Sequence, residues 1–253
     1  MEADVSEAQV RLERDGALAW LIFDNPARRN AVTAPMLAGT LSALHEAEAD
    51  DAVRVVILRG AGEQAFVSGA DISAFGSDDG VDRGGTGPVE ITEAMASMAK
   101  PVIAALRGWC LGAGAMLAFA ADVRVAGDDL RIGVPAAKLG VAYPREGVER
   151  MVALGGPAVA SELLLTGEPY DAASALRAGL VNRVVPAAVL FEEAAALAAL
   201  LAGNAPLTMR ASKLAIAGDA AADEVIAACF RSEDFAEGQR AFAEKRRPAF
   251  RGR

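Results

Sequence analysis

The sequence is short of the residue types from which many protein sites are built. Its 253 residues contain two cysteines, Cys110 and Cys229, and one histidine, His45. Two cysteines supply neither a disulfide framework nor a thiolate metal site, so we expect no metal and a reduced, cytoplasmic setting. His45 lies between Leu44 and Glu46 on a predicted helix, where a solvated side chain is favoured over a catalytic one.

Positive charge and long apolar runs are also scarce. The formal net charge is -9, so no domain-wide basic field exists to bind nucleic acid. The uncharged run at residues 108–121 is well short of the ~20 apolar residues that span a bilayer, and we expect no membrane span. The opening MEADVSEAQV lacks the basic and then apolar pattern of a secretory signal, which again favours the cytoplasm.

Apolar content is high, at 53% of residues, and predicts a large buried core. Apolar runs at residues 18–23, 53–58 and 102–106, interrupted only by Arg54, are typical of buried strands. Between the first two, Thr33 can cap a helix that starts near Pro35. Strands that alternate with helices in this way predict a mixed α/β fold.

The second half of the chain continues this pattern and then changes. DVRVA, LRIGV and VNRVV look like strands, whereas GPAVASELLLTG and DAASALRAG look helical and end at glycines. From Pro186 onward the chain is rich in Ala and Leu at helical period, so we predict a core over residues 1–185 and a helical region over residues 186–253. Residues 76–88, GSDDGVDRGGTGP, predict a mobile loop.

Two glycine-containing turns each follow an apolar run and precede a predicted helix. One is AFVSGADISAF, where a helix is expected from Ala70, and the other is RGWCLGAGAMLAFAAD. Helix starts leave backbone N–H groups unpaired, so two facing starts can hold a developing oxyanion. From the local pattern alone, the favoured interpretation is the simpler one, in which the glycines only permit tight turns.

The order of the motifs points to a known family. GADI, followed further along by KPVIAALRGWCLGAGAMLAFAADVRVA, resembles the paired oxyanion-hole segments of the enoyl-CoA hydratase/isomerase (crotonase) family. NPARRNAV, DDAVRVVILRGAG, LLLTGEPYDAASALRAGLVNRVVP and EGQRAFAEKRRPAF extend the resemblance over nearly the whole chain. It implies a spiral of repeated ββα units with a helical C-terminal subdomain that covers the pocket and forms a homotrimer or a dimer of trimers.

The resemblance also implies how an acyl-CoA thioester binds. The backbone N–H groups of Ala70 and Ala113 correspond to those that hold the thioester carbonyl oxygen. Arg28, Asp71 and Ile72 fall in segments that contact coenzyme A, and Asp71 also suits the first turn of its predicted helix. Coenzyme A enters as part of the substrate, so no separate cofactor is expected.

The tail adds a second set of candidate coenzyme A contacts. Phe242 and Lys245 match family residues that reach the nucleotide, often that of a neighbouring subunit. Lys245 also stands in a cationic cluster with Arg246, Arg247 and Arg251, which can meet phosphates. A solvated tail explains the arginines equally well.

Two positions depart from the hydratases of the family, which carry catalytic glutamates where this chain has Met116 and Ala136. Adding water to an enoyl thioester needs one carboxylate to activate the water and an acid to deliver the proton. A thioether and a methyl group supply neither, so weak hydratase activity is expected. Glu146 is the nearest acid in sequence to the vacated position and remains a remote candidate.

Tyr143 is the better candidate for a catalytic side chain. LGVAY, residues 139–143, resembles a segment of family members that decarboxylate methylmalonyl-CoA and place a tyrosine in the acyl pocket. Those enzymes have a histidine at the position of Ala70 and a glutamate at that of Met116, so neither group carries over. The alternative is a packed ring with its hydroxyl satisfied.

The expected function is acyl-CoA handling in fatty-acid or other acyl-CoA metabolism, with a thioester enolate stabilised by Ala70 and Ala113. The expected enzyme is a lyase or isomerase of the enoyl-CoA hydratase/isomerase type. Two alternatives stay open: a decarboxylase of a malonyl-type CoA thioester, and a non-catalytic acyl-CoA binder.

Overall fold

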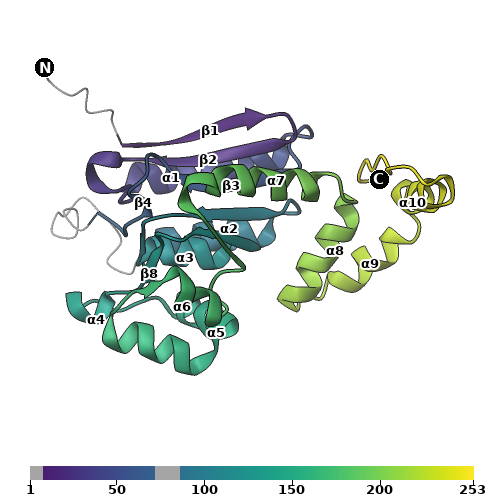
Figure 1. Cartoon of the computed structure of the whole chain (residues 1–253). Helices are drawn as coiled ribbons and strands as arrows, with labels where there is room; N and C mark the ends of the chain where they lie inside the picture. The colour runs from purple at the N-terminus through teal and green to yellow at the C-terminus, as the bar shows by residue number, and fades with distance from the viewer. Residues whose placement is uncertain (1–7, 72–85) are drawn as a thin grey trace, which may run out of the picture.

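Two β-sheets form the frame of the fold (Figure 1). The computed structural model describes residues 8–71 and 86–253. The larger sheet has the strand order β1-β2-β3-β5-β7-β10, and the smaller has the order β4-β6-β8-β9. Neighbouring strands run parallel in both sheets, except in the antiparallel pairs β1–β2 and β8–β9.

Each turn of the chain adds one strand to each sheet and then a helix. The elements of three turns are β3 (Val55–Gly60), β4 (Ala65–Val67) and α2 (Thr86–Ser97); β5 (Val102–Leu106), β6 (Trp109–Leu111) and α3 (Ala113–Ala120); β7 (Val123–Gly127), β8 (Arg131–Gly133), α4 (Ala136–Leu139) and α5 (Arg145–Thr166). The predicted spiral of ββα units is confirmed.

The first described elements are β1 (Gln9–Asp15) and β2 (Leu18–Asp24), which form an antiparallel hairpin. The apolar run at residues 18–23 is β2, as predicted, whereas β1 lies at the sheet edge and was not anticipated. A short 3-10 helix η1 (Pro26–Arg28) then leads to α1 (Ala34–Ala49). The predicted cap of α1 is confirmed, because the Thr33 hydroxyl accepts a hydrogen bond from the Met36 amide at 3.4 Å.

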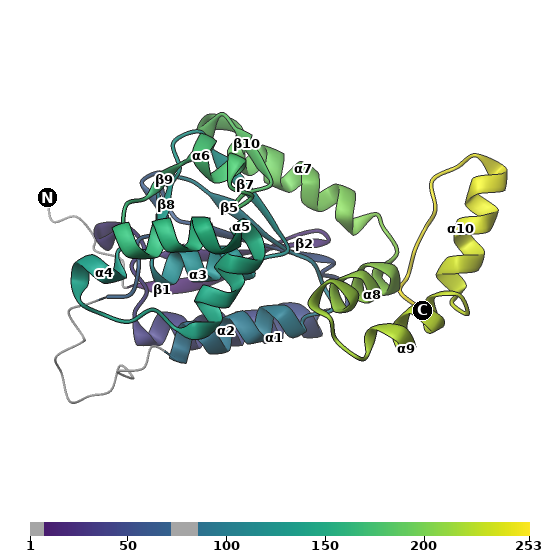
Figure 2. The same ribbon diagram turned by 90° about the horizontal axis from the view of Figure 1, so that it is seen from below.

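Helices dominate the end of the chain. After β9 (Tyr170–Asp171), α6 (Ala172–Arg177) and β10 (Arg183–Val185) come η3 (Ala187–Val189), α7 (Leu190–Ala202), α8 (Pro206–Ala217), α9 (Ala222–Cys229) and α10 (Glu233–Glu244). No strand follows Val185 in this part of the chain, all of which the structure describes. Figure 2 shows α7 against the core and the C-terminal arm, α8–α10, extending away from it.

The larger sheet is buried on both faces. Along β3, Val56 and Leu58 point into a core shared with α1, α2 and α3. Val55 and Ile57 point to the other face, into a second cluster with α7. A strand covered on both sides needs apolar residues at every position, which explains the continuous apolar runs that predict these strands.

Three sequence expectations need revision. The helix expected from Ala70 does not begin there, because Ala70 forms a parallel β-bridge with Val32. The loop predicted over residues 76–88 ends too late, because residues 86–88 already belong to α2; residues 76–85 lie outside the described residues. The segment GPAVASELLLTG is helical, but it is the second half of the longer α5, whose backbone breaks at Gly156 with φ of 80°. Among the described residues no single helix is long and apolar enough to cross a membrane. One pair of helices, Ala187–Ala202 and Pro206–Ala217, reaches that length and apolar content only when the two are taken together, and the pair is bent by 107°.

Candidate active site

A cavity of about 410 Å³ opens at the carboxyl ends of β4, β6 and β8. Adjacent parallel strands finish at the same edge of a sheet, so the segments that follow them meet there. Residues 68–71 after β4, 111–113 at the end of β6, and 134–136 after β8 all line the cavity. We call this cavity the acyl pocket, in keeping with the sequence-based expectation.

Glycines allow the first two of these segments to turn sharply and close together. Gly69 has φ of 125° and Gly112 has φ of 53°, both in the region that favours glycine. A β-carbon added to Gly114 would lie 2.1 Å from the carbonyl oxygen of Val67, so α3 starts in direct contact with β4. Both the turn conformation and this close approach therefore require glycine.

Ala70 and Ala113 lie at these two turns, and both residues line the pocket. Among the described residues, no group accepts a hydrogen bond from either amide. Val32 bonds to the backbone groups on each side of Ala70. Its N–H donates to the carbonyl oxygen of Gly69, and its carbonyl oxygen accepts from the N–H of Asp71, both at 2.9 Å. Ala113 is the first residue of α3, and the helix dipole adds positive electrostatic potential at this end of the helix. The two amides form a donor pair suited to an oxyanion.

The rest of the pocket wall is mainly apolar. Met116 is 4% exposed and Ala136 is 9% exposed, and both face the pocket. Among the described lining residues, Asp71 is the only carboxylate, and it forms an ion pair with Arg28. The structure therefore places one carboxylate at the pocket, held by an arginine, and none at the positions of Met116 and Ala136.

Tyr143 lines the pocket from the loop between α4 and α5. Its hydroxyl donates a hydrogen bond to the carbonyl oxygen of Gly112 at 3.1 Å. Burial raises the pKa of Tyr143 well above its usual range, so the phenol stays protonated and acts as a donor. The nearby Cys110 is also buried, and burial raises its thiol pKa. Neither side chain is a base at neutral pH.

A second cavity of about 510 Å³ adjoins the acyl pocket. The two cavities share Arg28, Ser68 and Leu111, and the second is also lined by Arg29 and Trp109. We call it the arginine recess. An elongated ligand can thus reach from the paired amides to a region with two guanidinium groups and an exposed indole.

Buried asparagines fix the turn that carries these arginines. Asn30 is 1% exposed, and its amide nitrogen donates to the carbonyl oxygens of Ala61 and Ala65, each at 2.9 Å. Its side-chain oxygen accepts a hydrogen bond from the Asn25 amide at 3.0 Å. NPARRN was expected to contact the ligand, and the supporting role of its asparagines was not predicted, although paired asparagines around a proline are a turn signal.

The structure brings some of the predicted site residues together and separates others. Those that line the acyl pocket are Arg28, Ala70, Asp71, Ala113, Met116, Ala136 and Tyr143. Glu146 is exposed in the first turn of α5 and lines a separate cavity of about 180 Å³, which shares Met116 with the acyl pocket. Ile72 lies outside the described residues.

The tail candidates lie far from the acyl pocket of their own chain. Phe242 is 88% exposed on α10, and Lys245 caps the same helix. Figures 1 and 2 both show α10 at the opposite end of the molecule from α4. Within one chain, no described residue beyond Pro144 lines the pocket, so the C-terminal arm does not cover it.

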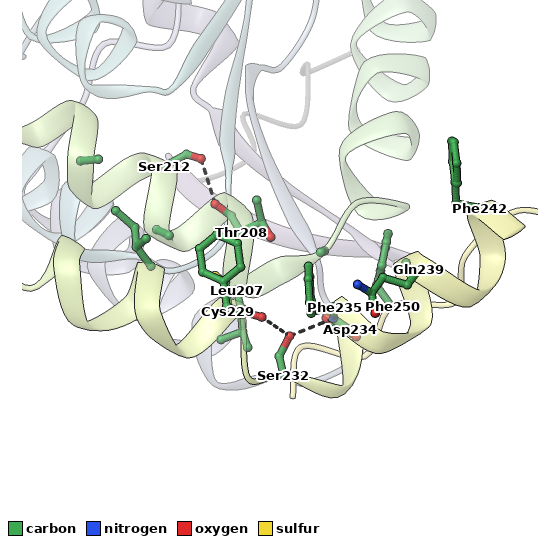
Figure 3. Close-up of a pocket in the computed structure, with 16 residues that line it drawn as sticks. Leu207, Thr208, Ser212, Cys229, Ser232, Asp234, Phe235, Gln239, Phe242 and Phe250 are labelled. Carbon is green, nitrogen blue, oxygen red and sulfur yellow. Dashed lines mark hydrogen bonds between the residues drawn. The ribbon is translucent and has the colours of Figure 1, made fainter.

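A larger cavity, about 640 Å³, lies between α8, α9 and α10 (Figure 3). Its walls are mostly aliphatic and aromatic, and they include Leu207, Phe235 and Phe250, which the close-up labels. Its one carboxylate, Asp234, accepts hydrogen bonds from the amides of Arg251 and Gly252 at 2.6 and 2.8 Å. This groove has the character of a packing surface.

A ββα spiral with two turn amides at one apolar pocket defines a class of proteins, and the comparisons agree with it. Residues 13–253 match the enoyl-CoA hydratase/isomerase family, and the chain belongs to that family. It is 34% identical over 249 residues to a short-chain-enoyl-CoA hydratase from Clostridium acetobutylicum, covering 94% of this chain and 95% of that protein.

Other relatives have different activities or solved structures. The chain is 35% identical over 259 residues to a carnitinyl-CoA dehydratase from Escherichia coli K12, covering 96% of this chain and 98% of that protein. The crystal structure of an enoyl-CoA hydratase from Bacillus anthracis superimposes with a TM-score of 0.90 at 29% identity, covering 96% and 99% of the two chains. The relatives thus include both hydratases and a dehydratase.

Proposed function

We propose that the acyl pocket binds the acyl end of a coenzyme A thioester and stabilises its enolate. The N–H groups of Ala70 and Ala113 donate to the thioester oxygen, which gains negative charge as the enolate forms. Donors already in place for that charge typically contribute a factor of about 10²–10³ each to the rate. The observation that carries the proposal is that Ala70 and Ala113 line one apolar pocket and that neither amide donates to a described group.

The arginine recess gives the nucleotide end of the ligand a place to bind. Guanidinium groups form charge-assisted hydrogen bonds to phosphate, and Arg28 and Arg29 are the two cations at this position. Trp109, 37% exposed, offers a flat surface against which an adenine ring can stack. Coenzyme A is part of the substrate in this scheme, and the proposal needs no further cofactor.

Apolar residues at the mouth of the pocket favour an acyl ligand. Leu139 is 55% exposed and Val141 is 46% exposed, and both line the pocket. Large apolar side chains gathered around a concave site mark a surface that binds apolar groups. A saturated or unsaturated acyl chain fits this rim better than a sugar or a charged metabolite.

The reaction proposed is of the lyase or isomerase type, with hydration of an enoyl thioester as a weak activity. Met116 and Ala136 supply neither an acid nor a base, whereas the donor pair is intact. A proton shift through an enolate depends most on the donor pair, and it needs only one group that takes up the proton and returns it at another carbon. Asp71, paired with Arg28, is the one described carboxylate at the pocket.

Decarboxylation of a malonyl-type thioester is a second candidate, favoured by the apolar walls. In that reaction the bond between the α-carbon and the carboxylate breaks, carbon dioxide leaves, and the electron pair forms the enolate. A proton from water then reaches the α-carbon. Met116 and Ala136 would destabilise a carboxylate ground state, and the donor pair would stabilise the enolate, so no catalytic carboxylate is required.

We also propose that the chain assembles as a homotrimer or a dimer of trimers through its C-terminal arm. Ile216 is 85% exposed and Phe230 is 66% exposed, and the cavity between α8, α9 and α10 is about 640 Å³ within one chain. An exposed apolar surface of this kind marks an interaction site. Assembly would also let Phe242 and Lys245 meet a nucleotide bound to another subunit, in the cytoplasm that the sequence favours.

The deciding experiment is a panel of thioesters. Purified protein is incubated with enoyl-CoA, malonyl-CoA and 3-hydroxyacyl-CoA compounds, and products are followed by mass spectrometry. We expect turnover of at least one compound, lost in the Ala113→Pro variant. Binding of acyl-CoA without any turnover would favour the third possibility, a binder that recognises the thioester but moves no proton. Absence of binding would refute the proposed function.

A further inference from the structure

The Tyr143 hydroxyl and the Ala113 N–H belong to two ends of one rigid unit. Tyr143 donates to the carbonyl oxygen of Gly112 at 3.1 Å. That carbonyl and the N–H of Ala113 are part of the same planar peptide group, in which C=O and N–H point in opposite directions. Any force that fixes the direction of the carbonyl therefore also fixes the direction of the N–H.

We propose that Tyr143 is a positioning residue that orients and polarises the Ala113 N–H through the Gly112–Ala113 peptide. The proposal rests on the proposed function of the acyl pocket and assigns a role to the tyrosine that involves no contact with the reacting atoms. A carbonyl that accepts a hydrogen bond makes the N–H of its own peptide a better donor, because hydrogen bonds in a chain polarise one another.

This peptide needs an external support. Gly112 has φ of 53° and ψ of -111°, and glycine gives the chain more rotational freedom than any other residue. Its own amide is held by the carbonyl oxygen of Gly133 at 3.0 Å. On the other side, its carbonyl oxygen accepts one helical hydrogen bond, from the Met116 amide at 3.0 Å. Tyr143 supplies the second bond and is the one described side chain that reaches this oxygen.

The tyrosine ring is itself tightly held. A β-carbon added to Gly147 would lie 2.6 Å from Cε1 of Tyr143 and 3.0 Å from the terminal carbon of Met116. Gly147 thus lets the start of α5 pack directly on both side chains. Because burial also raises the pKa of Tyr143, the hydroxyl keeps its proton and remains a donor throughout the working pH range. A fixed ring and a permanent proton are what a positioning role requires.

Three variants separate this role from direct catalysis. Tyr143→Phe removes the hydroxyl and keeps the ring. Gly147→Ala keeps the hydroxyl but displaces the ring, since its methyl group meets Cε1. Tyr170→Phe is the matched control: Tyr170 is the other tyrosine of the chain, and its hydroxyl bonds to Glu162 on the surface.

The first readout is the absorption band of a chromophoric enoyl thioester, 4-dimethylaminocinnamoyl-CoA. The band moves to longer wavelength when the thioester oxygen accepts hydrogen bonds. We expect Tyr143→Phe and Gly147→Ala each to lose at least about half of this shift while the dissociation constant changes less than about 3-fold. On any thioester that turns over, kcat should fall at least ~10-fold in Tyr143→Phe, with KM and the shape of the pH profile unchanged. Tyr170→Phe should match wild type.

The second readout needs no ligand. In isotope-labelled protein, the carbonyl carbon of Gly112 should change its NMR chemical shift in Tyr143→Phe and keep it in Tyr170→Phe. An unchanged Gly112 resonance in Tyr143→Phe would overturn the proposal, as would a full wavelength shift in that variant. The proposal would also be overturned if the pH profile of kcat lost its rising or falling part in Tyr143→Phe, because that loss would assign proton transfer to the phenol. If wild type binds no acyl-CoA, the proposed function fails, and the Gly112 resonance alone decides this inference.

Discussion

Gly112 lies so close to Gly69 that a β-carbon added to Gly112 would come within 3.9 Å of the Gly69 Cα atom. The two glycines follow the neighbouring parallel strands β4 and β6, and each precedes one amide of the donor pair. The spacing of Ala70 and Ala113 therefore follows from strand pairing, and not from the long stretch of chain that separates them. Sequence patterns identified both turns but not their contact.

Ala113→Pro tests the donor pair with little change to the fold. Ala113 is the first residue of α3, a position where proline is well tolerated because its missing N–H has no helical partner. The variant should keep its circular dichroism spectrum and lose about 10²–10³-fold in kcat on any active thioester. Glu233→Pro is the matched control, because Glu233 is the first residue of α10, the preceding Ser232 is extended, and no described group accepts a hydrogen bond from the Glu233 amide. Undiminished turnover in Ala113→Pro would exclude this amide from the mechanism.

Without carboxylates at positions 116 and 136, we expect slow hydration of enoyl thioesters. Wild type should hydrate crotonyl-CoA slowly, since Met116 and Ala136 activate no water. Met116→Glu combined with Ala136→Glu should raise this activity at least ~10-fold, at the cost of a lower melting temperature because both sites are buried. The double glutamine variant has similar volume and no acid, and it should stay at the wild-type rate. Rapid hydration by wild type, after removal of contaminating host enzyme, would contradict the prediction.

Periodicity and capping predicted those elements whose stability is local or whose faces are uniformly buried. The strand at residues 102–106 is apolar at every position because both faces of the sheet are covered, and it is β5 in the structure. Strand β1 escaped prediction because only Val10 and Leu12 pack on the core, while charged residues such as Glu13 alternate with them. An alternating pattern this short resembles a polar terminus until its partner strand is known.

The acyl pocket shows where sequence reasoning ends. The family resemblance pointed to Ala70 and Ala113, and the fold places both at one cavity. The bond from Tyr143 to Gly112 depends on how the loop before α5 folds over β6, and no local pattern encodes that path. The distance of Lys245 from its own pocket is likewise a property of the arm's direction, which is set by packing after α7.

Met116 separates the acyl pocket from the smaller cavity that Glu146 lines. Met116→Ala should join the two and admit acyl chains a few carbons longer, measured as a shift in chain-length preference among acyl-CoA ligands. Loss of a buried methionine should also lower the free energy of unfolding by about 2–5 kcal/mol. Met151→Ala removes an equally buried methionine that lines neither cavity, so it should destabilise the fold without changing chain-length preference.

Glu237 makes the C-terminal arm sensitive to acid. Hydrogen bonds from Arg246 and from the Ala249 amide lower its pKa from 4.5 to about 2. A carboxyl group with a lowered folded-state pKa stabilises the fold fully above pH 4.5, and this stabilisation is lost as the pH falls towards 2. Glu237→Gln should therefore flatten the fall in melting temperature between these pH values.

The control for that prediction is another glutamate of an ion pair. Glu149→Gln removes an exposed carboxylate whose contact with Arg145 is longer, at 3.6 Å. It should follow the wild-type acid profile more closely than Glu237→Gln does. Equal profiles for all three proteins would show that the contact between Arg246 and Glu237 does not stabilise the arm.

Lys245 tests whether one subunit contributes to the ligand site of another. It lies at the end of α10, remote from the acyl pocket of its own chain, so it can meet a coenzyme A phosphate only across a subunit contact. Lys245→Ala should weaken coenzyme A binding by roughly 1–2 kcal/mol, and the loss should shrink as salt is added. Calorimetry at low and high salt gives the change in affinity and its salt dependence, and light scattering gives the assembly size.

Arg183→Ala, an exposed cation on β10, controls for the general loss of charge. An unchanged dissociation constant at low salt, in an assembled protein, would leave Lys245 as part of a solvated tail, because a cation in contact with a phosphate cannot be removed without loss of affinity.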